Sequence, residues 1–305
     1  MLMPDVLAET PPQPRTLTRP AKSRLFLNKV SRLRMGIIGG IILLGLLGAA
    51  LTAPWLAPFD PFEQDIMSRL QPPAWMPGGS SEHLLGTDGV GRDLLSRIIH
   101  GSRISLVVGL TAVLLQVVIG VAMGLAAGYY RGWVDSSISF MVNVMLGFPF
   151  ILLAMSLVAV LGPSLQNIII ALGLTGWPIF TRVTRVETLK LRDLEFVLAA
   201  RSLAFSTLRI VGKHILPNLL PSILVLATVE VARAIIRESL LSFLGLGIQP
   251  PTPSWGAMLA EGRDYMLMQW WLAAFPGLAI FLSALGINLL GDGLRDMIDP
   301  HLRKD

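Results

Sequence analysis

Long apolar runs without any charged residue constrain this chain more than any other feature. The longest covers 46 residues, from 136 to 181. A membrane-crossing helix needs about 20 apolar residues, so this run suits two helices, with Gly162-Pro163-Ser164 as the turn between them. Four further spans are predicted over Met35–Phe59, over Ile104–Tyr130, from Pro217 past Val229, and over Tyr265–Gly291. The sequence therefore predicts an all-α membrane protein with six transmembrane helices.

The composition agrees with a membrane protein and excludes several site chemistries. The chain has 305 residues, of which 53% are hydrophobic and 15% are charged, whereas soluble domains carry about a quarter charged residues. It has no cysteine, which excludes disulfides and thiolate metal sites. The four histidines are scattered, at His83, His100, His214 and His301. We therefore predict no metal site.

The first apolar run, residues 35–59, could alternatively belong to a secretory signal peptide. It follows a basic tail of more than 30 residues and has no small-residue cleavage site before Pro54, unlike a signal peptide. We interpret residues 35–59 as an uncleaved first transmembrane anchor.

The distribution of lysine and arginine predicts the orientation. Residues 1–35 carry seven basic and two acidic residues, and loop 182–216 carries seven basic and three acidic residues. Loop 60–103 carries four basic and six acidic residues. Because basic loops stay in the cytoplasm, both termini and loop 182–216 are predicted to be cytoplasmic.

The resulting division has five parts. These are a basic cytoplasmic tail (1–34), the first anchor (35–59), an outer loop (60–103), a transmembrane core (104–292) and a cytoplasmic C-terminal tail (293–305). The core includes the cytoplasmic loop 182–216 and an outer loop 246–264.

The chain lacks the parts needed to drive transport or catalysis by itself. It has no phosphate-binding GxxxxGK[ST] loop, and its Gly-Lys pair, Gly212-Lys213, stands in the wrong setting. The predicted spans also lack the chain of acidic and histidine residues typical of proton-coupled carriers. We predict no catalytic residue and no cofactor in this chain, and we expect a partner to supply the energy.

The stretch from 193 to 217 is the main candidate for contact with such a partner. Asp193 is a predicted N-cap for a helix through Leu203, and Ser206 for a second helix ending near His214. Apolar residues fall on one side of each helix: Leu194, Val197, Leu198, Ala200 and Ala204, then Leu208, Val211 and Ile215. Pro217 suits the first turn of the fifth span. These residues alone fit a protein-docking surface and a helix lying on the lipid interface equally well.

This stretch resembles the cytoplasmic "EAA" loop of permease subunits in binding-protein-dependent ABC importers. Ala199, Ala200 and Ile215-Leu216-Pro217 match that pattern, whereas Leu198 replaces its glutamate and Ala204 its glycine. The replacements remove a charge and stiffen the turn. The resemblance implies an ATPase-coupling loop that contains Leu198, Ala199, Ala200, Arg201, Ala204, Arg209, Ile215, Leu216 and Pro217.

Three further segments resemble the second, C-type permease subunit of the dipeptide/oligopeptide family. They are "HLLGTDGVGRDLLSRIIHGSRISL" (His83–Leu106), "LSFLGLGIQPPTPSWGAML" (Leu241–Leu259) and "NLLGDGLRDMIDP" (Asn288–Pro300). The whole resemblance covers roughly residues 30–302. Nickel- and glutathione-importing members of the family share these motifs, so the motifs do not identify the cargo.

The resemblance implies a non-enzymatic, pore-forming permease subunit of an ABC importer in a bacterial inner or plasma membrane. Its expected partners are a second homologous permease, two ATP-binding subunits that hold ATP and Mg²⁺, and an extracytoplasmic substrate-binding protein. The expected cargo is dipeptides or short oligopeptides, with a nickel chelate, glutathione or another small solute as the alternative. A stand-alone secondary carrier would leave the docking-like loop without a role.

The outer-loop motif consists of Gly86, Thr87, Asp88, Gly91, Arg92, Asp93 and Trp255. Its aspartates suit caps and loop hydrogen bonds, and Arg92 suits a bidentate carboxylate partner. The motif fits a folded loop that seals the outer mouth of the pore, or a contact with a delivering protein. We expect Trp255, Trp270 and Trp271 to anchor at the membrane interface, with gating by Trp255 as the alternative.

The fifth span carries Glu230, Arg233, Arg237 and Glu238, the translocation-pathway candidates. Glu230, Arg233 and Arg237 follow an i, i+3, i+7 spacing, and partial neutralisation is expected on one face, both within the pair Glu230–Arg233 and within the set Arg233–Arg237–Glu238. A charge at mid-membrane depth needs a partner or water. The cluster fits an ion pair with the partner permease or the lining of a wet pathway for zwitterionic cargo.

Overall fold

The computed structural model describes residues 22–298 and the side chains of residues 34–297. Predictions for residues 1–21 and 299–305 lie outside the described residues. The described part is helical, without strands, which confirms the all-α prediction. The longer helices are α1 (Lys22–Leu51), α3 (Leu94–Tyr130), α4 (Gly132–Gly147), α5 (Phe150–Leu161), α6 (Leu165–Leu191), α9 (Leu216–Phe243) and α11 (Trp271–Ile298). The shorter ones are α2 (Ala53–Leu56), η1 (Ile66–Ser68), α7 (Glu195–Ser202), α8 (Thr207–Ile210), η2 (Val211–Ile215), α10 (Trp255–Gly262) and η3 (Arg263–Tyr265).

Within the described residues, four helical stretches are long and apolar enough to cross a membrane. They lie in α1, α3, α11 and the continuous stretch Thr207–Phe243, which runs through α8, η2 and α9. The bent pair α4 and α5 would make a fifth span. Helix α6 has the length of a span but falls short in apolarity, because Arg182, Arg185 and other charged residues occupy its C-terminal part.

Several helices extend beyond the predicted spans, although their apolar centres agree. Helix α3 starts at Leu94 rather than Ile104, because Asp93 caps it: the carboxylate of Asp93 accepts a hydrogen bond from the backbone N–H of Ser96. Helix α11 runs to Ile298 and so includes the first residues of the predicted C-terminal tail. Helix α1 instead ends at Leu51, eight residues before the predicted end of the first span, and the short α2 follows it.

The long apolar run is divided at two places rather than one. The predicted turn at Gly162-Pro163-Ser164 is confirmed, because α5 ends at Leu161 and α6 begins at Leu165. A second break at Phe148 and Pro149 bends α4 from α5 by 89°. Proline disfavours helical backbone at the residue before it, and Phe148 accordingly has extended dihedrals, φ −94° and ψ 138°. The prediction of a single helix between the start of the run and the turn at Gly162 was wrong, because α4 and α5 occupy this part.

Helices α3 and α6 approach each other closely along a row of glycines on α3. A Cβ atom placed on Gly120 would lie 2.5 Å from the Cβ of Phe180. Cβ atoms on Gly124 and Gly128 would each lie 2.6 Å from a threonine Cβ of α6, that of Thr184 and of Thr188. Small residues spaced by four allow two membrane helices to pack backbone to backbone. This contact joins the two helices into one unit.

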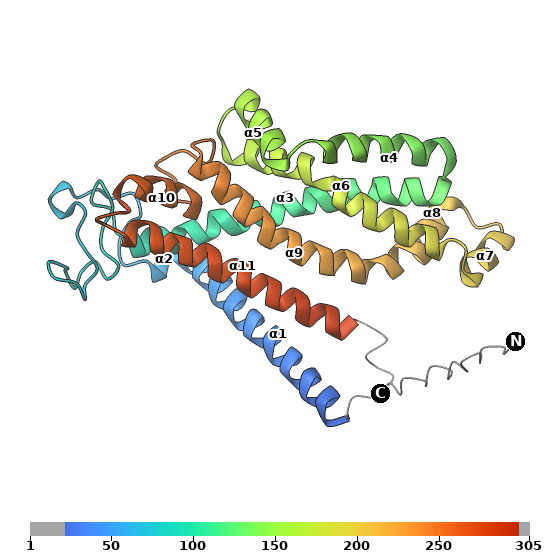
Figure 1. The fold of residues 1–305 in the computed structure, drawn as a ribbon, viewed down its shortest axis with the longest axis horizontal. Helices are drawn as coiled ribbons and strands as arrows, with labels where there is room; N and C mark the ends of the chain where they lie inside the picture. The colour runs from blue at the N-terminus through green and yellow to red at the C-terminus, as the bar shows by residue number, and fades with distance from the viewer. Residues whose placement is uncertain (1–21, 299–305) are drawn as a thin grey trace, which may run out of the picture.

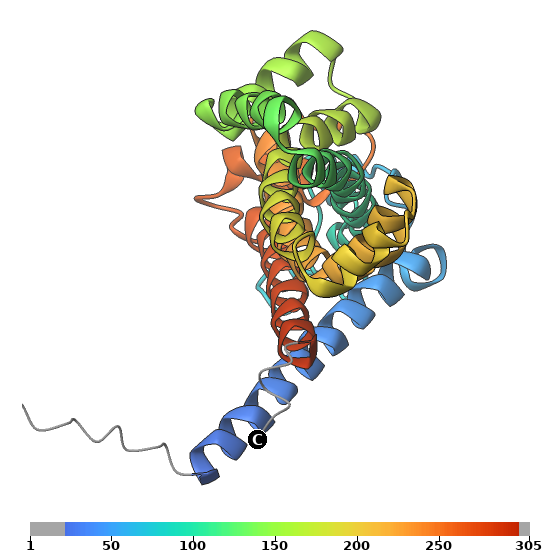
Figure 2. The same ribbon diagram turned by 90° about the vertical axis from the view of Figure 1, so that its right-hand side faces the viewer.

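The helices run roughly lengthwise, so that the loops gather at two opposite ends (Figure 1). Residues 60–93 and α10 lie at the left end, and α7 and α8 lie at the right end. Helix α3 connects these ends. Helices α1 and α11 pair with each other and slant away from the remaining helices, which the second view also shows (Figure 2).

The glycine row predicts a severe packing defect when one glycine is enlarged. The substitution Gly124→Leu must push α6 away from α3, and overpacking of this kind costs about 1 to 3 kcal/mol or more of folding free energy. We expect a clear loss of monodisperse protein and a lower unfolding temperature in detergent. Gly48→Leu on α1 is the control, because open space surrounds Gly48. Similar stability of the two variants would contradict the close contact.

Candidate functional site

The outer-loop motif folds as a tight turn before α3. Thr87 and Asp93 form an antiparallel bridge, and His83 contacts Asp93 with 3.0 Å between Nδ1 and Oδ1. Gly91 has φ +83°, and a Cβ there would lie 1.7 Å from the carbonyl oxygen of Asp65. This position therefore requires glycine, both for its left-handed backbone and for the close approach.

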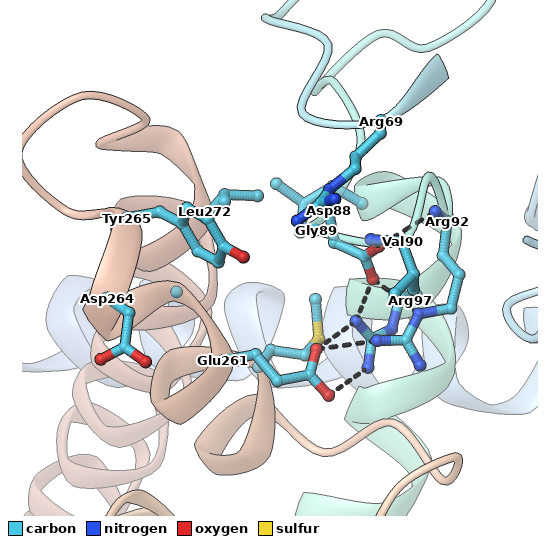
Figure 3. A pocket seen from close by; sticks show the side chains of 13 residues that line it. Arg69, Asp88, Gly89, Val90, Arg92, Arg97, Glu261, Asp264, Tyr265 and Leu272 are labelled. Carbon is cyan, nitrogen blue, oxygen red and sulfur yellow. Dashed lines mark hydrogen bonds and ion pairs between the residues drawn. The ribbon is translucent and has the colours of Figure 1, made fainter. Parts of the chain in front are cut away.

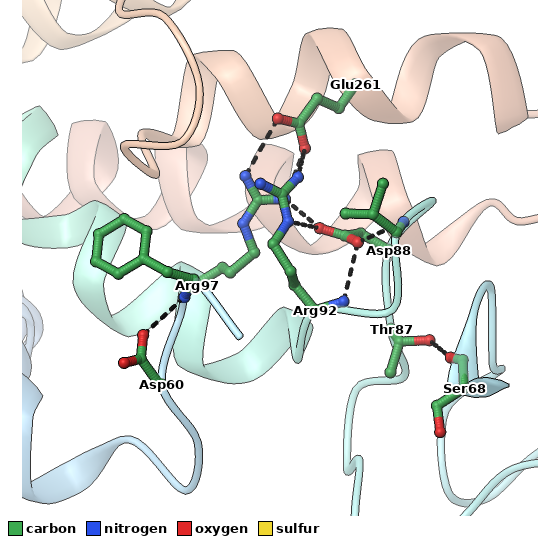
Figure 4. Close-up of polar contacts among 9 residues, drawn as sticks. Asp60, Ser68, Thr87, Asp88, Arg92, Arg97 and Glu261 are labelled. Carbon is green, nitrogen blue, oxygen red and sulfur yellow. Dashed lines mark hydrogen bonds and ion pairs between the residues drawn. The ribbon is translucent and has the colours of Figure 1, made fainter. Parts of the chain in front are cut away.

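The motif leads into a network that we call the outer ion cluster, which consists of the buried Asp88, Arg92 and Arg97 and the part-buried Glu261. Arg92 bridges two carboxylates, with 2.7 Å from Nε to Asp88 Oδ2 and 2.9 Å from Nη2 to Glu261 Oε2. Arg97 contacts the same two acids, at 2.6 Å from Nη1 to Glu261 Oε2. Figure 4 shows both guanidinium groups between the two carboxylates. Arg92 was predicted to bind one carboxylate with two of its nitrogens. It instead bridges two carboxylates, Asp88 of the outer loop and Glu261 of α10, and so joins the loop to this helix.

The cluster holds Asp88 in its charged form. Burial would raise the pKa of the Asp88 carboxyl, but the guanidinium groups of Arg97 and Arg92 and hydrogen bonds from backbone N–H groups bring that pKa below its ordinary value. A carboxyl with a lowered pKa stabilises the folded state above its unfolded pKa of about 3.9. This contribution is lost as the pH falls through the lower, folded-state pKa.

A cavity of about 340 Å³ lies beside the outer ion cluster. Arg69 and Gly89 of the outer loop and Tyr265 and Asp264 of η3 are among its lining residues (Figure 3). The two acids and two arginines of the cluster pair with one another, so their charges balance, although the buried Nε of Arg97 has no hydrogen-bond partner. The outer loop is therefore folded and joined to α10, and its role as a seal of the pore stays a prediction.

Trp255 is not an interface anchor, so that prediction was wrong, and the alternative that it gates the outer mouth stays a prediction. It is fully buried at the start of α10, and its indole Nε1–H donates to the carbonyl oxygen of Ile98 at 3.0 Å. The neighbouring Glu238 is also fully buried, with its carboxylate 2.8 Å from Ser242 Oγ and 3.2 Å from Ser254 Oγ. Since Ser254 caps α10, Glu238 fixes this outer helix to α9. Trp271 is buried as well, whereas Trp270 remains exposed.

The outer ion cluster predicts a large cost when one of its cations is removed. Arg97→Met leaves Asp88 buried beside fewer counter-charges, and breaking a buried pair costs roughly 3 to 5 kcal/mol. We expect a marked fall in the unfolding temperature of the purified protein. The control is Arg263→Gln, which removes an exposed pair with Asp264 worth at most about 1 kcal/mol. Equal losses from both variants would contradict a structural role for the cluster.

The charged residues of α9 divide into two groups, and Glu238 does not join the arginines. Glu230 is 1% exposed and accepts from Arg233 Nη1 at 2.7 Å and from Arg237 Nη1 at 3.0 Å. The guanidinium of Arg237 also lies 4.0 Å from the ring centre of Phe150, directly after the bend between α4 and α5. We call Glu230, Arg233 and Arg237 the α9 triad. The predicted pair of Glu230 and Arg233 is confirmed. The predicted neutralisation that included Glu238 was wrong, because serine hydroxyls hold Glu238.

The coupling-loop candidates form a short helix and a longer helical stretch at the end of the molecule opposite the outer cluster (Figure 1). Helix α7 begins at Glu195 with Leu194 at its N-cap position, so the predicted cap by Asp193 was wrong. Ser206 stands at the N-cap of α8, as predicted, but its side chain makes no capping bond. Pro217 lies within a continuous helical stretch, and the π-turn Val211–Ile215 precedes it.

The predicted small apolar side of α7 is divided, because Val197 and Ala200 pack against their own chain whereas Leu194, Leu198 and Ala204 are exposed. Val197 and Ala200 are buried with Ile210, Ile215 and Leu219. The exposed positions are Leu198, Ala199, Leu203, Ala204, Leu208 and Arg209. A docking surface on this loop would therefore use these exposed residues rather than Ala200 or Ile215. Arg201 is part-buried, over the ring of Tyr129 at the end of α3.

Ala204 adopts a backbone conformation that favours glycine. Its φ is +54°, one of three positive values at non-glycine residues in the described part of the chain. Left-handed backbone costs a residue with a Cβ atom about 1 to 2 kcal/mol. The position where the coupling-loop pattern has glycine is thus a strained turn in this chain.

Some site residues were not predicted from the sequence. Glu261 and Arg97 complete the outer ion cluster, although 164 positions separate them. Phe150 reaches the α9 triad from another helix. The sequence offers one signal for the outer ion cluster, which is an arginine near the start of the apolar helix α3. An arginine on the apolar face of a helix needs an acid nearby.

Comparisons with known proteins place this architecture in a family. The family described as "Binding-protein-dependent transport system inner membrane component" matches residues 117–304. The "N-terminal TM domain of oligopeptide transport permease C" matches residues 23–73. The first match covers more than half of the chain. The chain therefore belongs to this family of membrane transport components, which confirms the resemblance seen in its motifs.

Its relatives include named permeases of similar length. The chain is 43% identical to the di/tripeptide transport system permease protein DppC of Pseudomonas aeruginosa, over 88% of this chain and 89% of that protein. It is 44% identical to the dipeptide transport system permease protein DppC of Escherichia coli, over 92% and 93%. The fold is similar to that of the MetNI methionine ABC transporter in an inward-facing conformation, with a TM-score of 0.54 and 18% identity over 67% of this chain and 96% of that chain.

Proposed function

We propose that this chain is a pore-forming permease subunit of an ATP-driven importer of dipeptides or short oligopeptides. The observation that carries the proposal is its identity of 43% to 44% with peptide permeases over about nine-tenths of both chains. Its partners are a second homologous permease, two ATP-binding subunits and an extracytoplasmic substrate-binding protein. The subunit lies in the bacterial inner membrane and itself carries out no covalent chemistry.

The proposed topology has six spans and both termini in the cytoplasm. Four spans are the apolar stretches in α1, α3, α8–α9 and α11. The bent pair α4 and α5 makes the fifth span, and α6 makes the sixth. Loop 182–216 then faces the cytoplasm, and the outer loops 60–103 and 246–264 face the opposite side. The position of α7 and the outer ion cluster at opposite ends of the helices supports this arrangement (Figure 1).

The proposed ATPase dock is the exposed surface of α7 and α8. Leu203 is 68% exposed and Leu208 is 86% exposed. Neighbouring exposed apolar residues on a polar, basic loop suit contact with another protein. Buried packing beneath this surface joins α7 to α9 and, through Tyr129 and Val121, to α3. Movement of the dock would therefore move the spans directly, as alternating access requires.

This dock predicts that a charge at Leu208 breaks the complex without unfolding the subunit. Leu208→Glu buries an unpaired carboxylate in the contact, which costs several kcal/mol. We expect the tagged variant to insert normally, to lose at least about 90% of its copurifying ATP-binding subunits, and to lose ATP-dependent uptake of radiolabelled alanyl-alanine.

Leu267→Glu is the matched control, since Leu267 is fully exposed and lies between η3 and α11 rather than in the α7–α8 loop. It should retain the ATP-binding subunits. Normal copurification of Leu208→Glu would place the dock elsewhere.

Competition between solutes tests the proposed cargo. In the wild-type complex, uptake of alanyl-alanine should be reduced by other dipeptides. Reduction by glutathione or a nickel chelate instead would contradict peptide cargo.

A further inference from the structure

The α9 triad carries two positive charges and one negative charge. Both carboxylate oxygens of Glu230 are occupied, Oε1 by Arg233 and Oε2 by Arg237. Across the side chains described for residues 34–297, Glu230 is the one carboxylate within 4.0 Å of either guanidinium. Glu238, one residue after Arg237, is turned to Ser242 and Ser254 instead. The triad therefore keeps a net charge of +1.

This charge lies well inside α9, past the middle of the membrane-crossing stretch Thr207–Phe243. Glu230 is the fifteenth of the 28 residues of α9, about 21 Å from its start at 1.5 Å per residue. An uncompensated charge at this depth costs several kcal/mol, unless water or an anion reaches it. The net charge of the triad therefore calls for an anionic group from outside this chain.

Arg233 is the member of the triad that can receive such a group. Its side chain is 52% exposed, compared with 25% for Arg237 and 1% for Glu230. Arg237 is also covered by the ring of Phe150. Arg233 donates to Glu230 through Nη1 alone, and a guanidinium has five N–H donors. Its remaining N–H groups can bind a carboxylate in the bidentate geometry that arginine favours.

Apolar surface continues from Arg233 along the same side of α9. Ile236 and Leu240 stand three and seven residues after Arg233, and both are exposed. A helix places residues with this spacing on one face. The face therefore offers a fixed cation next to an apolar strip, which fits a small molecule that has a carboxylate at one end and uncharged side chains beside it.

We propose that Arg233 binds the terminal carboxylate of the cargo as it crosses the membrane. This inference rests on the proposed function, because a dipeptide provides this carboxylate. Glu230 and Arg237 act as positioning residues: Glu230 holds one edge of the guanidinium, and Arg237 neutralises Glu230, so that Arg233 keeps its charge available. Glu230 therefore does not cancel the cation that the cargo meets.

The test compares two probes that differ only at the carboxylate, alanyl-alanine and its C-terminal amide. Uptake is measured with the complete importer in liposomes, with excess binding protein and saturating probe, so that loading of the binding protein is not limiting. For each probe, the uptake by Arg233→Gln is divided by that of the wild type. This ratio cancels any preference of the binding protein, which is the same in both measurements.

We expect Arg233→Gln to lower uptake of alanyl-alanine at least about tenfold and uptake of the amide less than about twofold. Arg233→Lys keeps the charge but not the bidentate fork, and should fall between wild type and Arg233→Gln for alanyl-alanine. Arg263→Gln, an exposed arginine of η3 paired with Asp264, is the control and should leave both ratios near one.

Two results would overturn the inference while leaving the proposed function intact. One is unchanged uptake of both probes by Arg233→Gln. The other is an equal loss of uptake for both probes together with loss of the second permease on purification, which would make Arg233 an ion-pair partner between the subunits. Failure of the wild-type importer to carry either probe would instead contradict the proposed function, and the inference with it.

Discussion

The close contact between α3 and α6 is the interaction on which the rest of the structure depends. Glycines at 120, 124 and 128 let the two backbones meet, and α3 runs for 37 residues, about 55 Å. Asp93 and the outer ion cluster hold its start. At its other end, the carbonyl oxygen of Tyr129 accepts from Arg192, and the ring of Tyr129 lies beside Arg201. One rigid helix therefore joins both functional ends of the molecule.

Two clusters of charged side chains differ in net charge, and this difference separates a structural role from a functional one. In the outer ion cluster two arginines meet two acids, so that the four charges balance in a structural clamp. In the α9 triad one acid meets two arginines, so that a positive charge is left over well inside a span. Charges kept within a membrane are costly. The uncompensated charge is accordingly the better candidate for contact with a transported solute.

The sequence predicted the features that depend on local pattern. Charge-free runs located the apolar stretches, and Gly162-Pro163-Ser164 located a turn. The bend at Pro149 was missed, although proline gave a local signal for it. Features that depend on distant residues could not be predicted. Arg97 pairs with Glu261, from which it is separated by 164 positions. The indole of Trp255 donates to the carbonyl oxygen of Ile98, which lies in another helix. Ala200 followed the coupling-loop pattern, but packing against Ile210 turned it inward.

The central claim is that the α7–α8 surface and the outer ion cluster face opposite sides of the membrane. Thiol labelling tests it directly, because the chain has no cysteine of its own. Ser81 and Ser206 are both exposed. Ser81 belongs to the segment 60–93 and Ser206 precedes α8, and these segments lie at opposite ends of the molecule (Figure 1). In intact spheroplasts, an impermeant maleimide should label Ser81→Cys at once and Ser206→Cys only after the membrane is permeabilised. Labelling of both positions from the same side would contradict the account.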